Sequence, residues 1–164
     1  MELLKHYVYS VIIQHEDMHT KNLSLIYDKD LVFFAPLYDV SCTGIYDTSK
    51  GYDTHLTING KQSNIRPNDF KALCKILKID FKEFKEEAFK IAKLYEIELP
   101  SYIEEIKALG SIPFYKKKQK PRIGEGAYLK VSKIPIEFHE LLSKFHKERV
   151  EHLKALGWII NESL

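Results

Sequence analysis

Three side chains in the first quarter of the sequence have the types and the spacing that phosphoryl transfer requires. Asp17 is followed five positions later by Asn22, and Asp39 comes directly after a short apolar run. Phosphoryl transfer needs one carboxylate to hold the attacking hydroxyl and oxygen ligands to fix Mg²⁺ against the phosphates. We therefore predict Asp17 as the catalytic base, and Asn22 and Asp39 as ligands of Mg²⁺.

The order Asp, Asn, Asp is also the order of the catalytic and metal-binding residues in protein kinases. Residues 17–22 (DMHTKN) and 36–39 (PLYD) resemble the D-x-H-x-K-N and P-x-Y-D motifs of the HipA family of bacterial serine/threonine kinases. Residues 54–61 resemble the end of an apolar strand in that family. The resemblance extends from about residue 3 to about residue 78.

This resemblance implies that the chain transfers the γ-phosphoryl group of ATP to a protein serine or threonine, as part of a toxin–antitoxin system. It implies a DNA-binding antitoxin as partner and an aminoacyl-tRNA synthetase as a possible substrate. Lys21 is a candidate to neutralise charge on the transferred group, and His19 and Tyr38 are expected to orient and pack the loop. Glu16 stands where H-R-D kinases have arginine, so an activation-loop phosphate would find no arginine here.

Two other interpretations are open. His15, Glu16 and His19 spell H-E-x-x-H, in which two histidines on one helix bind zinc and the glutamate is the base of a hydrolase. That interpretation leaves residues 21–22 and 36–39 unexplained. Alternatively, the chain is a non-catalytic binding module, or a pseudokinase remnant that contacts a partner.

The elements that must position these residues can be predicted from hydrophobic periodicity. A helix that buries Leu4, Val8, Val11 and Ile12 on one face leads into the loop at 15–22. Strands at 23–27 and 31–34 flank a polar turn and form a hairpin. Because the outer ends of a hairpin lie together, it should bring Asn22 and Asp39 to one place.

The remaining chain is predicted to be mostly helical. Residues 40–66 are irregular, and a helix with Pro67 in its first turn follows. A second helix is capped by Asp80 and ends at Pro100, before a short helical segment at 101–109. Residues 111–134 are expected to be irregular, and a last helix begins at Pro135. These elements predict an α+β, mostly helical fold, a single domain over 1–164 that resembles a kinase large lobe with a small hairpin at the catalytic site.

Composition adds limits on the class of protein. The 164 residues are 45% hydrophobic and 29% charged, with a net charge of +2, as in a soluble globular domain. Two cysteines are too few for a disulfide framework, and the N-terminus does not resemble a signal peptide, so we expect a cytoplasmic protein without a membrane span. The basic run at 116–122 is expected to be a solvated loop, not a nucleic-acid site. Gly124-Glu125-Gly126 is expected to be a turn.

The small lobe of a kinase, with its glycine-rich loop and nucleotide-binding lysine, normally comes before the catalytic loop. Sixteen residues before Asp17 leave no space for it. We therefore expect the small lobe to come from elsewhere, and an apolar face near residues 7–12 or 33–37 to be exposed where it docks.

Overall fold

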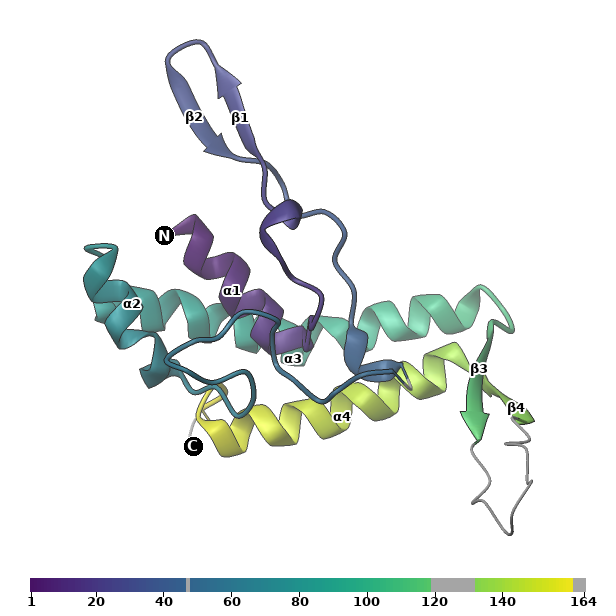
Figure 1. Cartoon of the computed structure of the whole chain (residues 1–164). Helices are drawn as coiled ribbons and strands as arrows, with labels where there is room; N and C mark the ends of the chain where they lie inside the picture. Colours follow the sequence, from purple (N-terminus) through teal and green to yellow (C-terminus); the bar gives the residue numbers. More distant parts are fainter. Residues whose placement is uncertain (47, 119–131, 161–164) are drawn as a thin grey trace, which may run out of the picture.

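The computed structural model describes residues 1–46, 48–118 and 132–160 (Figure 1). The helices are α1 (Glu2–Ile13), α2 (Lys71–Ile76), α3 (Phe81–Ala108) and α4 (Phe138–Leu156), and short 3₁₀ turns lie at Thr20–Asn22, Thr43–Ile45 and Pro67–Phe70. Two antiparallel hairpins join β1 (Leu25–Asp28) to β2 (Leu31–Phe34) and β3 (Pro113–Lys118) to β4 (Ser132–Glu137). The predicted α+β, mostly helical class is confirmed, whereas the likeness to a kinase large lobe stays a prediction.

The helical body is built around α1, which packs against α3 and α4 (Figure 1). Leu4, Val8, Val11 and Ile12 are buried, as their spacing predicts. They join the main core, which contains Phe84 of α3 as well as Leu153 and Trp158 from α4 and the turn after it. Residues 7–12 are therefore mostly interior, and the expectation that they form an exposed docking face is wrong.

The prediction that Pro100 ends the second helix is wrong, because α3 continues through it to Ala108. Proline inside a helix removes one backbone hydrogen bond and costs about 3 kcal/mol. Packing offsets this cost, since Ile103 beyond the proline is buried in a second core cluster with Ile45, Leu141 and Leu142. The other end of α3 is as predicted: the Asp80 carboxylate accepts hydrogen bonds from the backbone N–H groups of residues 82 and 83.

The polar region before the last helix contains the β3–β4 hairpin, which the sequence interpretation missed. Pro113 pairs with Glu137, and Tyr115 pairs with Pro135. Proline lacks a donor but is tolerated in an edge strand, and both strands of this sheet are edges. Pro135 thus belongs to β4, and α4 begins three residues later than expected. The segment 119–131, with most of the basic run and the Gly124–Gly126 pattern, lies outside the described residues.

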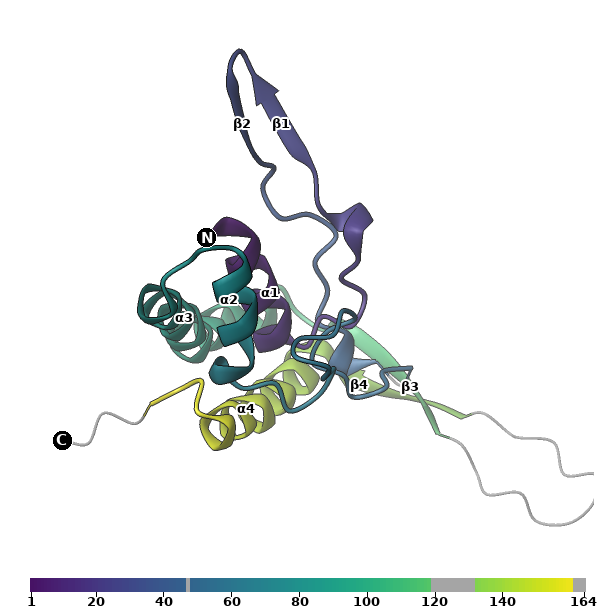
Figure 2. The same cartoon turned by 60° about the vertical axis from the view of Figure 1, so that its left-hand side comes forward.

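The β1–β2 hairpin projects away from the helical body (Figures 1 and 2). Its strands pair Leu25 with Phe34 through Asp28 with Leu31, close to the predicted boundaries. Apolar side chains on it are open to solvent, with Tyr27 73%, Leu31 66% and Val32 56% exposed. Within the range 33–37, Phe33 is 46% and Leu37 40% exposed, so the exposed apolar face expected there is present, whereas the docking of a small lobe on it stays a prediction.

Residues 54–61 do not form the expected strand end. His15 makes a single parallel bridge with Thr54, and Ile58 makes another with Lys61 across a tight turn. Asn59 and Gly60 both adopt positive φ at that turn, which breaks the extended conformation. None of the helices in the described ranges has the length and apolar character needed to cross a bilayer.

Candidate functional site

The end of α1 sets the position of Asp17. Gln14 adopts a left-handed conformation (φ 59°) and stops the helix. The next residues alternate between the interior and the surface: His15 and Met18 are buried, whereas Asp17 between them is exposed. The Ser10 hydroxyl donates to the Met18 sulfur and ties this loop to α1. The carboxylate of Asp17 is thus held at the surface by buried neighbours on both sides.

The hairpin brings Asn22 and Asp39 together, as predicted. The backbone N–H of His19 donates to Asn22 Oδ1 (2.9 Å), and Asn22 Nδ2 donates to Asp39 Oδ2 (2.9 Å). Asn22 is only 5% exposed, so its amide is fixed, whereas Asp39 is open to solvent. Asp39 adopts φ 53°, a left-handed conformation that Asp tolerates better than most residues. His19 orients the loop through its backbone.

Tyr38 joins the two chain segments at the end of the β1–β2 hairpin opposite its turn, which we call the foot of the hairpin. Its hydroxyl donates to the backbone carbonyl oxygen of Lys21 (2.6 Å) and lies 2.8 Å from Ser24 Oγ. The N–H of Ala35 also donates to the carbonyl of Ser24 (2.9 Å), which extends the pairing below the two strands. The Lys21 side chain is exposed beside this closure. Tyr38 therefore holds the segments that contain Asn22 and Asp39 in register, in agreement with the packing role expected for it.

His15, two positions before Asp17, is a buried histidine. Burial lowers the pKa of its imidazole, while the negative charges of Asp17 and Asp39 act in the opposite direction. Of the predicted site residues, Asn22 and Asp39 are in direct contact, and Asp17 lies exposed two positions after buried His15.

The zinc interpretation does not fit this geometry. The H-E-x-x-H site needs both histidines on one helix, whereas α1 ends at Ile13, before His15 and His19. Glu16, the base in that interpretation, has its carboxylate occupied by hydrogen bonds from residues 49–52. In the ranges that the structure describes, no group of three or more His, Cys, Asp and Glu side chains is placed to bind a metal ion.

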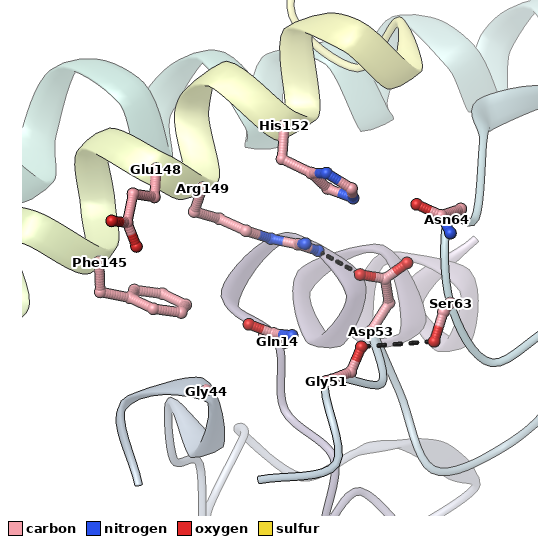
Figure 3. Close-up of a pocket in the computed structure, with 10 residues that line it drawn as sticks. All are labelled: Gln14, Gly44, Gly51, Asp53, Ser63, Asn64, Phe145, Glu148, Arg149 and His152. Carbon is pink, nitrogen blue, oxygen red and sulfur yellow. Dashed lines mark hydrogen bonds and ion pairs between the residues drawn. The ribbon is translucent and has the colours of Figure 1, made fainter. Parts of the chain in front are cut away.

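An open cavity of about 530 Å³ lies beside Asp17. Its lining includes Glu16, Asp17, Tyr46, Ser49 and Tyr52. A second cavity of about 280 Å³ lies between residues 51–64 and α4 (Figure 3). An ion pair between Arg149 and Asp53 occupies one side of that second cavity.

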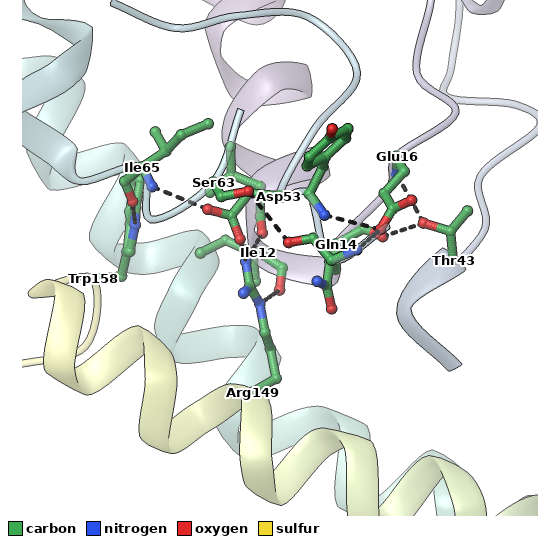
Figure 4. A network of polar contacts seen from close by, with 12 residues as sticks. Ile12, Gln14, Glu16, Thr43, Asp53, Ser63, Ile65, Arg149 and Trp158 are labelled. Atoms are coloured by element: carbon green, nitrogen blue, oxygen red, sulfur yellow. Dashed lines mark hydrogen bonds and ion pairs between the residues drawn. The ribbon is translucent and has the colours of Figure 1, made fainter. Parts of the chain in front are cut away.

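The ion pair is part of a polar network that fixes the C-terminal end of α1 (Figure 4). Arg149 Nη2 lies 2.8 Å from Asp53 Oδ1, and the two side chains are only 5% and 2% exposed. The same guanidinium donates to the backbone carbonyls of Val11 and Ile12. These are among the last carbonyls of a helix, which have no partner within it. Arg149 therefore holds the helix end from which the loop that contains Asp17 departs.

Sequence reasoning missed Arg149 and Asp53. One signal for Arg149 was present, because it occupies the apolar stripe of the last helix between Phe145 and Leu153, at helical spacing. A charged residue in such a stripe is buried only when it is paired.

Comparison with known proteins agrees with these observations. The family model of the HipA-like C-terminal domain matches residues 1–108, from α1 through the end of α3. Because this match covers more than half of the sequence, the chain belongs to the HipA-like C-terminal domain family. Members of this toxin family are kinases, and the family is associated with antitoxin partners. No curated protein matches the chain.

Proposed function

We propose that this chain is the large lobe of a serine/threonine kinase that transfers the γ-phosphoryl group of ATP to a protein hydroxyl. The observation that carries the proposal is the 2.9 Å contact between Asn22 and Asp39 at the foot of the hairpin, together with the exposed carboxylate of Asp17 on the loop that leads to Asn22. The family match supports the same function.

In this proposal, Asp17 accepts the proton of the attacking hydroxyl, and Lys21 neutralises charge on the transferred group. Asn22 and Asp39 would hold Mg²⁺, which neutralises the phosphates when it is bound. Their donor set fits a hard cation that prefers oxygen. The Asn22 amide oxygen accepts one hydrogen bond and has a second lone pair, and the Asp39 carboxylate has further acceptor sites beyond its bond with Asn22.

The exposed hairpin indicates where a small lobe would dock. A two-stranded hairpin is marginally stable by itself, and contiguous exposed apolar residues mark interaction surfaces. Asn22 and Asp39 lie at its foot, so a lobe that covers the hairpin would also cover a nucleotide bound there. We propose that such a lobe, in a longer protein or a separate chain, supplies the phosphate-covering loop and lysine. An antitoxin as regulator and an aminoacyl-tRNA synthetase as substrate are proposed from the family resemblance alone.

The direct test is transfer from labelled ATP to a protein acceptor, with the purified chain alone and mixed with the product of a neighbouring small-lobe gene. We expect weak nucleotide binding and no transfer by the 164 residues alone, and transfer in the mixture, because an open site neither orients nor shields the phosphates. Efficient transfer by the chain alone would contradict the need for a second lobe. No transfer in either sample would favour the binding-module alternative.

The docking surface can be tested separately from catalysis. Tyr27 and Val32 face each other across the strands, so Tyr27→Lys with Val32→Glu replaces an exposed apolar pair with an opposite-charge pair that preserves the hairpin. We expect this double variant to lose binding to the small lobe, and any self-association of the free chain, as measured by analytical ultracentrifugation. Ile76→Lys, at a position 75% exposed on α2, is the matched control. Equal loss in the control would show a general charge effect.

A further inference from the structure

The side chain of Glu16, directly before Asp17, accepts more hydrogen bonds than its neighbours in the loop. The backbone N–H of Lys50 donates to Oε2 (2.9 Å), and those of Gly51 and Tyr52 donate to Oε1 (2.8 and 3.0 Å). The Ser49 hydroxyl donates to Oε1 as well. Four consecutive residues, 33 to 36 positions further along the chain, therefore converge on one carboxylate.

The backbone of Glu16 is fixed too. Its N–H donates to the hydroxyl of Thr43 (2.9 Å), and that hydroxyl donates to the carbonyl of Gln14 (2.6 Å). The N–H of Thr43 also donates to the same carbonyl (3.2 Å). These hydrogen bonds fix the backbone of Glu16 to Thr43 and to the end of α1. Because residues 49–52 bind the side chain of this fixed residue, their position depends on Glu16.

Successive backbone N–H groups that point at one place form a concave site for an anion, and the Glu16 carboxylate fills this one. Gly51 adopts φ 77°, a conformation that most residues disfavour, which lets the N–H groups turn toward the carboxylate. Burial would raise the pKa of Glu16, but the hydrogen bonds from residues 49–52 outweigh burial and lower it. The ionised form is therefore the form that the segment binds.

Ser49, Lys50 and Tyr52 form a wall of the cavity that Asp17 also lines. We propose that Glu16 is a positioning residue, which holds this wall beside Asp17 without any modification of the segment. Kinases with arginine at this position bind a phosphate on their activation loop, whereas this carboxylate contacts the unmodified backbone directly. The role in transfer rests on the proposed function, whereas the anchoring itself does not.

The anchoring can be tested by NMR hydrogen exchange of the free chain. We expect the amides of Lys50, Gly51 and Tyr52 to be protected, and to exchange at least about tenfold faster in Glu16→Ala because charged hydrogen bonds are lost. Glu16→Gln should keep part of the protection, since its amide oxygen can accept some of the bonds. Amides of α3 serve as an internal reference, and Glu86→Gln is the control. Unchanged protection in Glu16→Ala would overturn the proposal.

Acid titration tests whether the protection of residues 50–52 depends on the negative charge of Glu16. Because the pKa of Glu16 is lowered in the folded protein, the protection should persist below the usual pKa of Glu. It should be lost as pH falls through the lowered value. In Glu16→Gln this step should be absent. The other titratable groups that line the cavity stay in both proteins, so they cannot account for the difference: Asp17, Tyr46, Lys50, Tyr52 and His55. A step of equal size in Glu16→Gln would overturn the assignment to Glu16.

An activity measurement then tests the positioning role, in the assembly that transfers phosphate. In Glu16→Gln we expect a higher KM for the protein acceptor and an unchanged KM for ATP, because the residues that line this cavity include Asp17 but neither of the proposed metal ligands, Asn22 and Asp39. A rise in both constants would indicate a merely structural role and overturn the positioning assignment. If the wild-type assembly transfers nothing, the proposed kinase function fails, while the exchange experiment still decides whether Glu16 anchors residues 49–52.

Discussion

Replacing Asp17 or Asp39 by Asn should reduce phosphoryl transfer at least about 10³-fold, because the base and the metal ligand act on one transition state. The free energy of unfolding should change by less than about 1 kcal/mol, since both side chains are exposed. The measurement is single-turnover transfer in the active assembly, together with urea unfolding of each variant.

Asp30→Asn, in the turn of the hairpin, is the matched control for the loss of one exposed negative charge. The double variant Asp17→Asn/Asp39→Asn should be little worse than either single variant, because residues that act as a unit are strongly non-additive. Full transfer by a stably folded Asp17→Asn would show that this loop is not the catalytic loop.

Arg149→Ala should lower the free energy of unfolding by about 3–5 kcal/mol, because it leaves the carboxylate of Asp53 buried without its partner. It also removes the Arg149 donor from the carbonyl of Ile12, whereas the carbonyl of Val11 keeps the backbone N–H of Gln14 (3.4 Å). Urea unfolding followed by circular dichroism measures the change. Lys144→Ala, on the exposed face of the same helix, should cost little and serves as the control.

A second comparison tests the cause of this loss. The double variant Arg149→Met/Asp53→Leu removes both buried charges and should recover part of the stability, because apolar residues can replace a buried pair. Recovery should be incomplete, since the carbonyl of Ile12 loses the Arg149 donor and the N–H of Ile65 loses the Asp53 acceptor. A loss below about 1 kcal/mol in Arg149→Ala would contradict the role assigned to the network.

The parts of the fold that the sequence predicted are those determined by nearby residues. The face of α1, the turn between β1 and β2, and the Asp80 cap all depend on a few adjacent positions. The meeting of Asn22 and Asp39 follows from hairpin geometry alone. These local signals are strong because periodicity, capping and turn chemistry agree.

The parts that failed depend on distant contacts. Nothing close to Pro100 indicates that α3 continues, because the compensation comes from packing of Ile103 against other elements. The β3–β4 hairpin is hidden by lysines and prolines, and its pairing is visible only when both strands are known. The Glu16 anchor and the pair of Arg149 with Asp53 join residues that no local pattern connects.

The contact between Arg149 and Ile12 joins residues 137 positions apart. During translation, α1 and the loop that contains Asp17 leave the ribosome long before α4. The end of α1 therefore forms before the guanidinium of Arg149 is available to bind it. Until then, the carbonyl of Ile12 lacks this donor, and the end of α1 is held only by local hydrogen bonds such as that from Gln14 N–H to the carbonyl of Val11. We therefore expect the proposed catalytic residues to lack a fixed position in the nascent chain, and the site to become defined only after the last helix has emerged. Under the proposed function, this order of events would delay kinase activity until synthesis has passed α4.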